Sequence, residues 1–591
     1  MREHKIRPLN RNTLYDLIRT SRGEAEADLY IKNGTLINVY TGELQKVNIA
    51  VKGAHIAYVG TAEQMVGHQT TVVEAGGLYL CPGYIEPHAH PFHTYTPATL
   101  AEQVLALGTT TMVCDNLFFF MLMGPQQLAL LWREFDQWPV KMLLSIRLDP
   151  QTYSSKRAAL FEPHLLEPLL ELTATKQVGE LTDWPSLLAG REQMLDNIIA
   201  TGSRGKRVEG HAPGASVETL NALAAAGVSA CHESISGEEA LRRLRLGMYA
   251  TLRHSSLRQD LPVLLKSLLD AGIDLNRAMI TTDGVTPPYM GAGFTDHLLR
   301  LAIEEGVPPV EAYRMATLNP ATYYRMDDEL GGIAPGRLAD ILFLEDINNP
   351  TPVRVIAEGK QVAENGQLLT KLASPNWHDY GVKPVTGSLN GLTPRDMTPP
   401  AQDEPFPLMQ LVNPVITRRQ DCVLPSRNGV LDISNEAGLV YAALFGRAGG
   451  WVTTGIIAGF ADYLEGMACT STITGDILVL GQNPSEMLRS ANRMLDLGGG
   501  IVIAEKGTFI YELPLPLGGI MSPQPLDQLV DRCGYLYKLL AQRGHRHHDL
   551  LYTLLFLSAT HLPAIRLSPA GIMSVKDKKV LVPVRKAGWP R

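Results

Sequence analysis

The order of apolar and polar positions divides the chain into three blocks. Between residues 28 and 80, apolar and polar positions alternate between turn residues, which is typical of short antiparallel strands. A similar pattern returns late in the chain, at 339–344 and 353–359. Two β-rich segments on either side of a long insertion predict one small β-domain, assembled from residues 1–80 and 326–375.

The insertion, residues 81–325, alternates apolar strand-like runs with helical stretches. Residues 108–115 and 228–232 have the composition of buried strands, and residues 217–227 and 237–246 have the pattern of the helices between them. Repeated βα units of this length favour a (β/α)8 barrel, although a doubly wound sheet is compatible with the pattern alone.

The third block begins after a change in composition. Residues 376–410 are rich in proline, threonine and glycine and are predicted to form a linker. Residues 411–591 contain further strand-like and helical segments and predict a separate C-terminal α/β domain. The fold class is therefore expected to be α/β, with a barrel between a composite β-domain and this C-terminal domain.

Composition and charge exclude several classes of partner. The 591 residues carry a formal net charge of -7, which does not favour binding to nucleic acid or to an anionic membrane. Residues 1–7 carry charge where a signal peptide needs an apolar core, and no run approaches the roughly 20 apolar residues of a membrane span. The six cysteines form no close pair that would indicate a disulfide framework or a cysteine-type zinc site. We therefore expect a reduced, cytoplasmic protein that binds neither nucleic acid nor a membrane.

Two histidines, His88 and His90, are the first sign of chemistry. They lie one residue apart, shortly after the apolar run 77–82. Residues i and i+2 of a strand point to the same face, so both imidazoles can reach one metal ion from the end of a single strand. Such pairs are also common in proteins without a metal, so this one indicates a metal site only if further ligands lie downstream.

Four further polar residues close apolar strand-like runs downstream: Glu180, His211, His232 and Asp283. In barrel enzymes the carboxyl ends of the strands carry the site. Four histidines and two carboxylates can hold two divalent ions, with one carboxylate bridging them. Two ions about 3.5–4 Å apart lower the pKa of a shared water, and a neighbouring carboxylate can transfer its proton. The pattern therefore predicts a metal-dependent hydrolase.

Longer stretches carry a resemblance to a known family: 210–214 (GHAPG), 232–233 (HE), 239–249 (EALRRLRLGMY), 315–321 (MATLNPA), 495–500 (LDLGGG) and 512–516 (ELPLP). On these residues the chain resembles the bacterial adenine deaminase family of the amidohydrolase superfamily, along almost its whole length. The resemblance implies a metal-dependent barrel, a composite β-sandwich domain, and a C-terminal domain characteristic of adenine deaminases.

The resemblance also implies roles for the six residues. His88 and His90 bind one ion, His211 and His232 hold the second, Glu180 bridges the two, and Asp283 is both a ligand and a proton shuttle. In the implied reaction a metal-bridging hydroxide attacks C6 of adenine, and ammonia leaves to give hypoxanthine. We expect two divalent ions per chain, with manganese or iron preferred and zinc also suited to these ligands.

Four stretches depart from the family pattern near the expected pocket: 91–94 (PFHT), 253–256 (RHSS), 282–285 (TDGV) and 472–476 (TITGD). A site that lacks the family's donors and acceptors discriminates adenine poorly. A hydrolase of another cyclic amide or amidine is therefore the alternative function. The intact set of ligand residues argues against a non-catalytic member of the family, because burying such polar groups without a metal costs free energy.

Four residues are candidates for substrate binding: Arg253, His93, His254 and Trp184. Arg253 matches a family arginine, but an ion-paired arginine explains it equally well, and each of the other three also has an ordinary packing explanation. The histidine-rich segment 545–549 is predicted to be a helical, solvated surface segment. The expected partners are a small heterocyclic substrate and further copies of the chain in a symmetric homo-oligomer.

Overall fold

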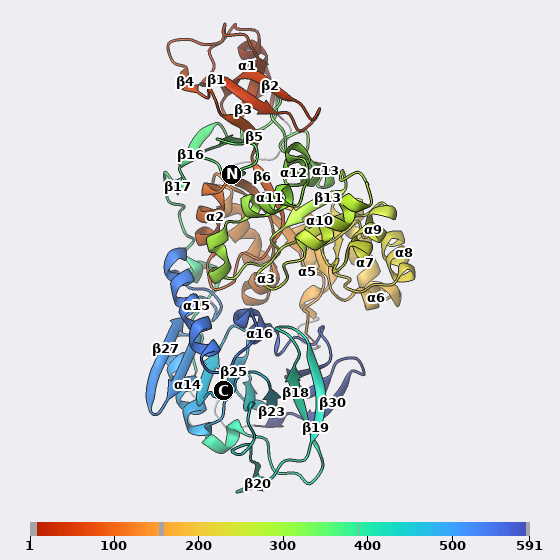
Figure 1. Cartoon of the computed structure of the whole chain (residues 1–591), viewed down its shortest axis with the longest axis vertical. Helices are drawn as coiled ribbons and strands as arrows, with labels where there is room; N and C mark the ends of the chain where they lie inside the picture. The colour runs from red at the N-terminus through yellow and green to blue at the C-terminus, as the bar shows by residue number, and fades with distance from the viewer. Residues whose placement is uncertain (1–8, 153–158, 388, 390, 587–591) are drawn as a thin grey trace.

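The computed structural model describes residues 9–152, 159–387, 389 and 391–586. Residues 1–7, whose charge argues against a signal peptide, lie outside this part. In Figure 1 a small β-sheet lies at one end of the molecule, the barrel in the middle and a C-terminal sheet at the other end. Among the described residues, no helix combines the length and the apolar composition needed to cross a bilayer.

The first sheet draws its strands from both sides of the barrel. Its order is β17-β16-β15-β14-β5-β1-β2-β3, with β4 beside β1. The strands are β1 (Leu29–Ile37), β2 (Leu44–Lys52), β3 (His55–Gly60), β4 (Thr71–Glu74), β5 (Tyr79–Pro82), β14 (Ile341–Leu344), β15 (Arg354–Ala357), β16 (Lys360–Glu364) and β17 (Gln367–Leu368), and helix α1 (Arg11–Ser21) precedes them. β5 and β14 join the two segments in antiparallel register, with Leu80 opposite Phe343.

Two pairings in this sheet differ from the expected antiparallel arrangement. β1 pairs in parallel with β4 and with β5. The alternation of apolar and polar positions records which face of a strand is buried, but it carries no information on the direction of the neighbouring strand. The predicted antiparallel direction is therefore wrong for these two pairings.

The middle sheet confirms the predicted barrel. Its eight strands follow one another in sequence order and every neighbouring pair is parallel. They are β6 (Tyr84–Ala89), β7 (Thr109–Asp115), β8 (Lys141–Ile146), β9 (Thr175–Leu181), β10 (Arg207–Gly210), β11 (Ala230–Cys231), β12 (Tyr249–Arg253) and β13 (Ala278–Thr281). A parallel bridge between Ala89 and Asp283 brings the first and last strands together and nearly closes the barrel.

Helices surround the barrel strands. The α-helices are α2 (Pro97–Ala106), α3 (Leu117–Phe135), α5 (Pro163–Leu170), α6 (Trp184–Leu188), α7 (Glu192–Ser203), α8 (Val217–Ala225), α9 (Gly237–Arg245), α10 (Leu261–Asp270), α11 (Thr295–Glu304), α12 (Pro309–Met315) and α13 (Leu318–Tyr323), with the short 3-10 helices η1 (Ala159–Phe161) and η2 (Pro287–Ala292). α8 and α9 begin where the sequence predicted, because Ser216 and Ser236 cap them by accepting from backbone amides three residues ahead.

The C-terminal sheet has the order β19-β18-β23-β22-β25-β24-β26-β27, with β31 beside β23. Its strands are β18 (Phe406–Leu411), β19 (Thr417–Cys422), β22 (Leu439–Phe445), β23 (Trp451–Ala458), β24 (Gly466–Cys469), β25 (Ile477–Gly481), β26 (Gly500–Glu505), β27 (Thr508–Pro514) and β31 (Arg585–Lys586). Two small sheets accompany it, formed by β20 (Ser426–Arg427) with β21 (Val430–Leu431), and by β28 (Ile565–Ser568), β29 (Gly571–Ser574) and β30 (Lys579–Pro583).

Two helices of the C-terminal part lie at its junction with the barrel (Figure 1). They are α15 (Leu526–Ala541) and α16 (Leu550–Phe556), whereas α14 (Pro484–Asp496) packs on the C-terminal sheet. The Ser522 amide donates to the Thr94 carbonyl at 2.8 Å, so this part of the chain is hydrogen bonded to the loop after β6.

The segment between the first and last sheets contains two short 3-10 helices, η3 (Trp377–Tyr380) and η4 (Pro394–Met397). Trp377 and Met397 are buried. The segment is tied to the barrel just before η3, where the Trp138 indole donates to the Ala373 carbonyl at 3.0 Å.

Candidate metal centre

His88 and His90 lie at the carboxyl end of β6, and their side chains meet. His88 is inside the strand and His90 follows its last residue. The two Nε2 atoms are 3.2 Å apart. His88 is buried, and His90 reaches the cavity over the barrel. The i, i+2 spacing thus places two imidazole nitrogens at one point on the barrel axis.

Glu180, His211 and His232 come from three successive strands further around the barrel. Glu180 is in β9, and His211 and His232 directly follow β10 and β11. His211 Nδ1 lies 3.2 Å from His232 Nε2, and His232 Nε2 lies 3.4 Å from Glu180 Oε2. The other oxygen, Glu180 Oε1, lies 3.8 Å from His90 Nε2. One carboxylate therefore faces both histidine pairs.

Asp283 completes the group from the last strand. It lies just beyond β13 in the left-handed region, with φ of 57°, a conformation that aspartate adopts more readily than most residues. Its Oδ1 is 3.0 Å from His90 Nε2 and 3.4 Å from His88 Nε2. Burial acts to raise the pKa of Asp283, but hydrogen bonds from His88 and His90 hold this pKa well below its usual range.

The donor set fits divalent metal ions. The ligand atoms of three groups, His88–His232–Asp283, His88–His90–Glu180 and Glu180–His211–His232, each lie within 4.8 Å of one another. Imidazole nitrogen and carboxylate oxygen suit zinc, manganese and iron. Burial acts to lower the pKa of His88, but the charge of Glu209 together with hydrogen bonds to Asp283 and Glu209 outweighs burial and raises this pKa to about 10. The surroundings therefore favour positive charge at the centre, as a metal site requires.

Glu209, which the sequence analysis did not single out, orients His88 and His232 through hydrogen bonds. His88 Nδ1 donates to Glu209 Oε2 at 2.8 Å, and His232 Nδ1 donates to Glu209 Oε1 at 3.1 Å. The Nε2 atoms of His88 and His232 therefore remain available to coordinate a metal ion. Gln177 also donates to Glu209, at 2.8 Å. Glu209 lies in β10, two residues before His211, so a carboxylate inside a buried strand was the available signal.

Replacing Glu209 with glutamine is expected to weaken metal binding by about 10- to 100-fold, because supporting partners of metal-bound histidines have effects of this size. Competition with a chelator, followed by elemental analysis, measures the change. Glu238→Gln, at an exposed glutamate of α9, is the matched control and should bind metal like the wild type. Unchanged metal affinity in Glu209→Gln would show that the histidines do not depend on this carboxylate for their orientation.

Arg147 and Asp115 form a second supporting group that sequence reasoning missed. Arg147 Nε donates to Asp115 Oδ2 at 2.8 Å, and its guanidinium also pairs with Glu180. Asp115 Oδ2 lies 3.0 Å from His90 Nδ1. Asp115 is the last residue of β7, so its position at a strand end was a signal of the same kind as those of the six predicted residues.

Arg253, predicted as a substrate residue, reaches the centre at the end of β12. Its Nη1 donates to Asp283 Oδ2 at 2.9 Å, and the same nitrogen pairs with Glu233. Arg258 Nη1 donates to the other oxygen of Glu233 at 3.0 Å. Arg253 therefore touches Asp283 directly, and its ion pairs fix its orientation.

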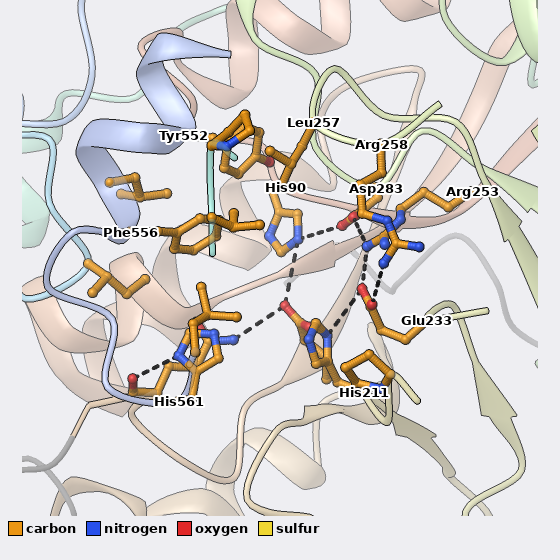
Figure 2. Close-up of a pocket in the computed structure, with 18 of the residues that line it drawn as sticks. His90, His211, Glu233, Arg253, Leu257, Arg258, Asp283, Tyr552, Phe556 and His561 are labelled. Atoms are coloured by element: carbon orange, nitrogen blue, oxygen red, sulfur yellow. Dashed lines mark hydrogen bonds and ion pairs between the residues drawn. The ribbon is translucent and has the colours of Figure 1, made fainter. Parts of the chain in front are cut away.

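A cavity of about 570 Å³ opens over these residues. Figure 2 shows Tyr552 and Phe556 projecting from α16 toward His90, with His561 beside them. His93 also lines the cavity, whereas His254 and Trp184 are not among its lining residues. The ring of His254 contacts that of His297, and Trp184 begins α6.

The segment 545–549 is not the predicted helix and is only partly the predicted solvated surface, because Arg546 and His548 are exposed while His545 and Asp549 are buried. It forms a loop, in which His545 is 7% exposed and donates from Nδ1 to the Phe460 carbonyl. His548 lines the cavity and donates to the Leu257 carbonyl at 2.9 Å, and Asp549 is fully buried. Because the segment is rich in charged residues, its composition did not indicate that it packs between the barrel and α16.

Comparisons with known proteins cover both main parts of the chain. Residues 79–362 match the amidohydrolase family, and residues 414–579 match the adenine deaminase C-terminal domain. The YerA protein of Bacillus subtilis is 39% identical over 562 residues, 94% of this chain and 95% of its own. An adenine deaminase of Moorella thermoacetica is 32% identical, over 96% of this chain and 97% of its own. Among solved structures, a β-aspartyl dipeptidase of Fervidobacterium islandicum AW-1 is similar to 58% of this chain and 99% of its own, at 18% identity and a TM-score of 0.46.

Proposed function

The chain belongs to the adenine deaminases of the amidohydrolase family, and on this basis we propose that it hydrolyses adenine to hypoxanthine and ammonia. The observation that carries the proposal is the extent of the similarity to the M. thermoacetica adenine deaminase, which covers 97% of that protein. The barrel and the C-terminal domain are both included. The small heterocyclic substrate expected from the sequence is then the purine base.

The six residues at the carboxyl ends of the barrel strands are proposed to hold two divalent ions. His88 and His90 bind one, His211 and His232 bind the other, and Glu180 bridges them, because its two oxygens face different histidine pairs. Asp283 completes the set through Oδ1. Manganese and iron are the proposed metals, and zinc is the alternative with the same ligand preferences.

Bound divalent ions would supply a water acidic enough to lose a proton near neutral pH. The overall reaction forms a C–O bond at C6 of adenine and breaks the C–N bond to the amino group. The water oxygen becomes the C6 carbonyl of hypoxanthine, so the water gives up two protons, one to the departing amino nitrogen and one to N1. A carboxylate beside the reacting atoms can take a proton from the water and deliver it to the amino nitrogen.

Asp283 is positioned for that transfer. Its Oδ1 faces the histidines, while Oδ2 accepts a hydrogen bond from Arg253 at 2.9 Å, so the carboxylate plane is fixed. Glu233 in turn holds Arg253. We assign proton transfer to Asp283 and orientation of its carboxylate to Arg253 and Glu233.

The cavity walls suit a flat aromatic base. Phe92 and Phe118 lie on the barrel side, and Phe556 lies on the C-terminal side. Phe92 packs edge-on against Phe118 with ring centroids 5.0 Å apart. These side chains can contact the faces of a purine and keep bulk water from the reacting carbon.

Wild-type protein loaded with manganese or iron is expected to release one ammonia for each adenine consumed, with the ultraviolet spectrum shifting to that of hypoxanthine. Prior treatment with a chelator should abolish the reaction, and readdition of metal should restore it, because the water is not acidic enough without the ions. Elemental analysis of the same samples gives the metal content. Fully loaded protein that leaves adenine unchanged would refute the proposal and direct attention to other cyclic amides and amidines.

A further inference from the structure

The roof of the cavity contains one pair of polar side chains that neither the metal ligands nor the proton transfer uses. The Tyr552 hydroxyl and His93 Nε2 are 2.8 Å apart, and both residues line the cavity. Tyr552 comes from α16, and His93 comes from the loop after β6. The pair therefore joins the C-terminal domain to the barrel directly beside the metal centre.

Gly284 provides the space for this pair. A Cβ at position 284 would lie 1.7 Å from the Tyr552 hydroxyl oxygen and 2.8 Å from His93 Nε2. Any side chain there would displace the tyrosine. Two of the stretches that depart from the family pattern, 91–94 and 282–285, thus meet at one point, where the phenol of Tyr552 occupies the space next to Asp283.

The orientation of Tyr552 is fixed by the capping of its helix. Asp549 caps α16 by accepting from the Tyr552 amide at 3.2 Å, and it also accepts from the Tyr537 hydroxyl at 2.8 Å. Asp549 is fully buried, and both bonds end on its Oδ1, so together they fix the carboxylate at the start of α16. Phe556, one helical turn later, stacks on Tyr552 with ring centroids 5.3 Å apart. In Figure 2 the two rings lie next to His90, on the side from which α16 approaches.

His93 is held from the other side. Its ring lies 5.6 Å, centroid to centroid, from that of His90 and 5.4 Å from that of Phe92. The next residue, Thr94, has φ of 70° and its carbonyl accepts from the Ser522 amide of the C-terminal domain. The loop conformation that presents His93 is therefore secured by the same domain that supplies Tyr552.

The pair leaves the hydroxyl hydrogen of Tyr552 free in the tautomer of His93 that carries its proton on Nε2. A tyrosine hydroxyl has one hydrogen to donate and two lone pairs to accept. If His93 Nε2–H donates to the Tyr552 oxygen, the hydroxyl hydrogen is available to the cavity. The purine ring offers N3 and N7 as acceptors away from the reacting C6–N1 bond, and the nearby carboxylates cannot donate to them while ionised.

We propose that Tyr552, oriented by His93, donates a hydrogen bond to N3 or N7 of the purine and so determines specificity for the base. This inference rests on the proposed deamination of adenine and adds a residue of the C-terminal domain to substrate recognition. Phe92 and Phe556 then contact the ring, while the Tyr552–His93 pair distinguishes a purine from a flat ring that lacks the acceptor.

The test uses the metal-loaded full chain and three ligands that it does not deaminate: hypoxanthine, 3-deazahypoxanthine and 7-deazahypoxanthine. Their dissociation constants are measured by calorimetry. Wild-type protein should bind hypoxanthine about 10- to 100-fold more tightly than one of the two deaza compounds, as expected for one buried hydrogen bond. In Tyr552→Phe this preference should nearly vanish, because hypoxanthine binds more weakly while that deaza compound is hardly affected.

Two further variants separate recognition from folding. Tyr289→Phe removes a tyrosine hydrogen bond to the His548 carbonyl of the C-terminal domain, and Tyr289 does not line the cavity, so the wild-type preference should persist. His93→Gln keeps an N–H donor for Tyr552 and should retain more of the preference than His93→Ala. The inference is overturned if wild-type protein binds none of the three ligands, if it binds them equally, or if Tyr552→Phe weakens all three by one factor.

The experiments distinguish a failure of this inference from a failure of the proposed function. Wild-type protein that fails to deaminate adenine, yet binds hypoxanthine with a preference that depends on Tyr552, would refute the reaction and leave the recognition intact. Deamination of adenine by wild-type protein, with no change of preference in Tyr552→Phe, would refute only the recognition. In the supported case Tyr552→Phe should also raise KM for adenine more than it lowers kcat.

Discussion

Asp283→Asn should lower kcat for adenine deamination by about 10³-fold or more while most of the metal stays bound. Loss of a proton-transferring side chain costs roughly 10²- to 10⁴-fold, and here one carboxylate serves both the water and the leaving nitrogen. Asparagine is the informative replacement because it tolerates the left-handed backbone of this position, where φ is 57°. Its amide oxygen can still face His88 and His90, so metal binding and proton transfer can be separated. Steady-state kinetics and elemental analysis of the same preparation give both quantities.

The matched control for Asp283→Asn is Asp274→Asn, in the exposed loop before β13, which should retain wild-type turnover. A thermal melt of each variant establishes that the barrel is folded. Turnover in Asp283→Asn within a factor of about ten of the wild type would be too small a loss for a proton shuttle. The transfer would then have to be assigned to another carboxylate at the centre.

Glu180→Gln is expected to have the largest effect on metal content. Its two oxygens face the two histidine pairs, at 3.8 Å from His90 Nε2 and 3.4 Å from His232 Nε2. The neutral amide removes the charge that a shared ligand contributes and also leaves Arg147 with one carboxylate partner fewer. The affinity for metal should fall by more than the roughly 10- to 100-fold predicted for Glu209→Gln, whose effect is indirect. Elemental analysis after dialysis, together with the rate of ammonia release, measures the loss.

Glu171→Gln provides the comparison for Glu180→Gln, since Glu171 pairs with Arg204 on the exposed surface of the barrel. It should bind metal and turn over adenine as the wild type does. Two ions retained by Glu180→Gln after dialysis would argue that the bridge is formed by another residue. Asp283 would be the first to examine, because its Oδ1 lies within 3.4 Å of Nε2 of both His88 and His90.

The barrel and the positions of the metal-binding candidates were predictable because both depend on local pattern. Each barrel strand is a short apolar run, and a polar residue that ends such a run must lie at the open end of the barrel. His88, His90, His211, His232, Glu180 and Asp283 all follow this rule. Asp115 also ends a strand, and it was missed because no metal-ligand spacing draws attention to a single aspartate.

The cavity wall was harder to predict because it depends on contacts between distant parts of the chain. His93 was a candidate from the sequence, but Tyr552 was not. Tyr552 and His93 are 459 residues apart in sequence, and no periodicity connects them. Conversely, Trp184 is near Glu180 in sequence and His254 is next to Arg253, but both lie outside the cavity lining. Nearness along the chain is a poor guide at the ends of barrel strands, where successive side chains point in different directions. The expected symmetric homo-oligomer stays a prediction, and light scattering on the purified protein tests it.

The close fit of Gly284 under Tyr552 has a consequence for how this enzyme can change over evolutionary time. A mutation at 284 alone is sterically blocked, and a smaller residue at 552 alone leaves a void beside the metal centre. The two positions are therefore expected to be epistatic, so that new base specificities become accessible through paired substitutions and remain hidden from single-site libraries. A combinatorial library over 284, 552 and 93 would explore this path without altering any of the six metal-binding candidates.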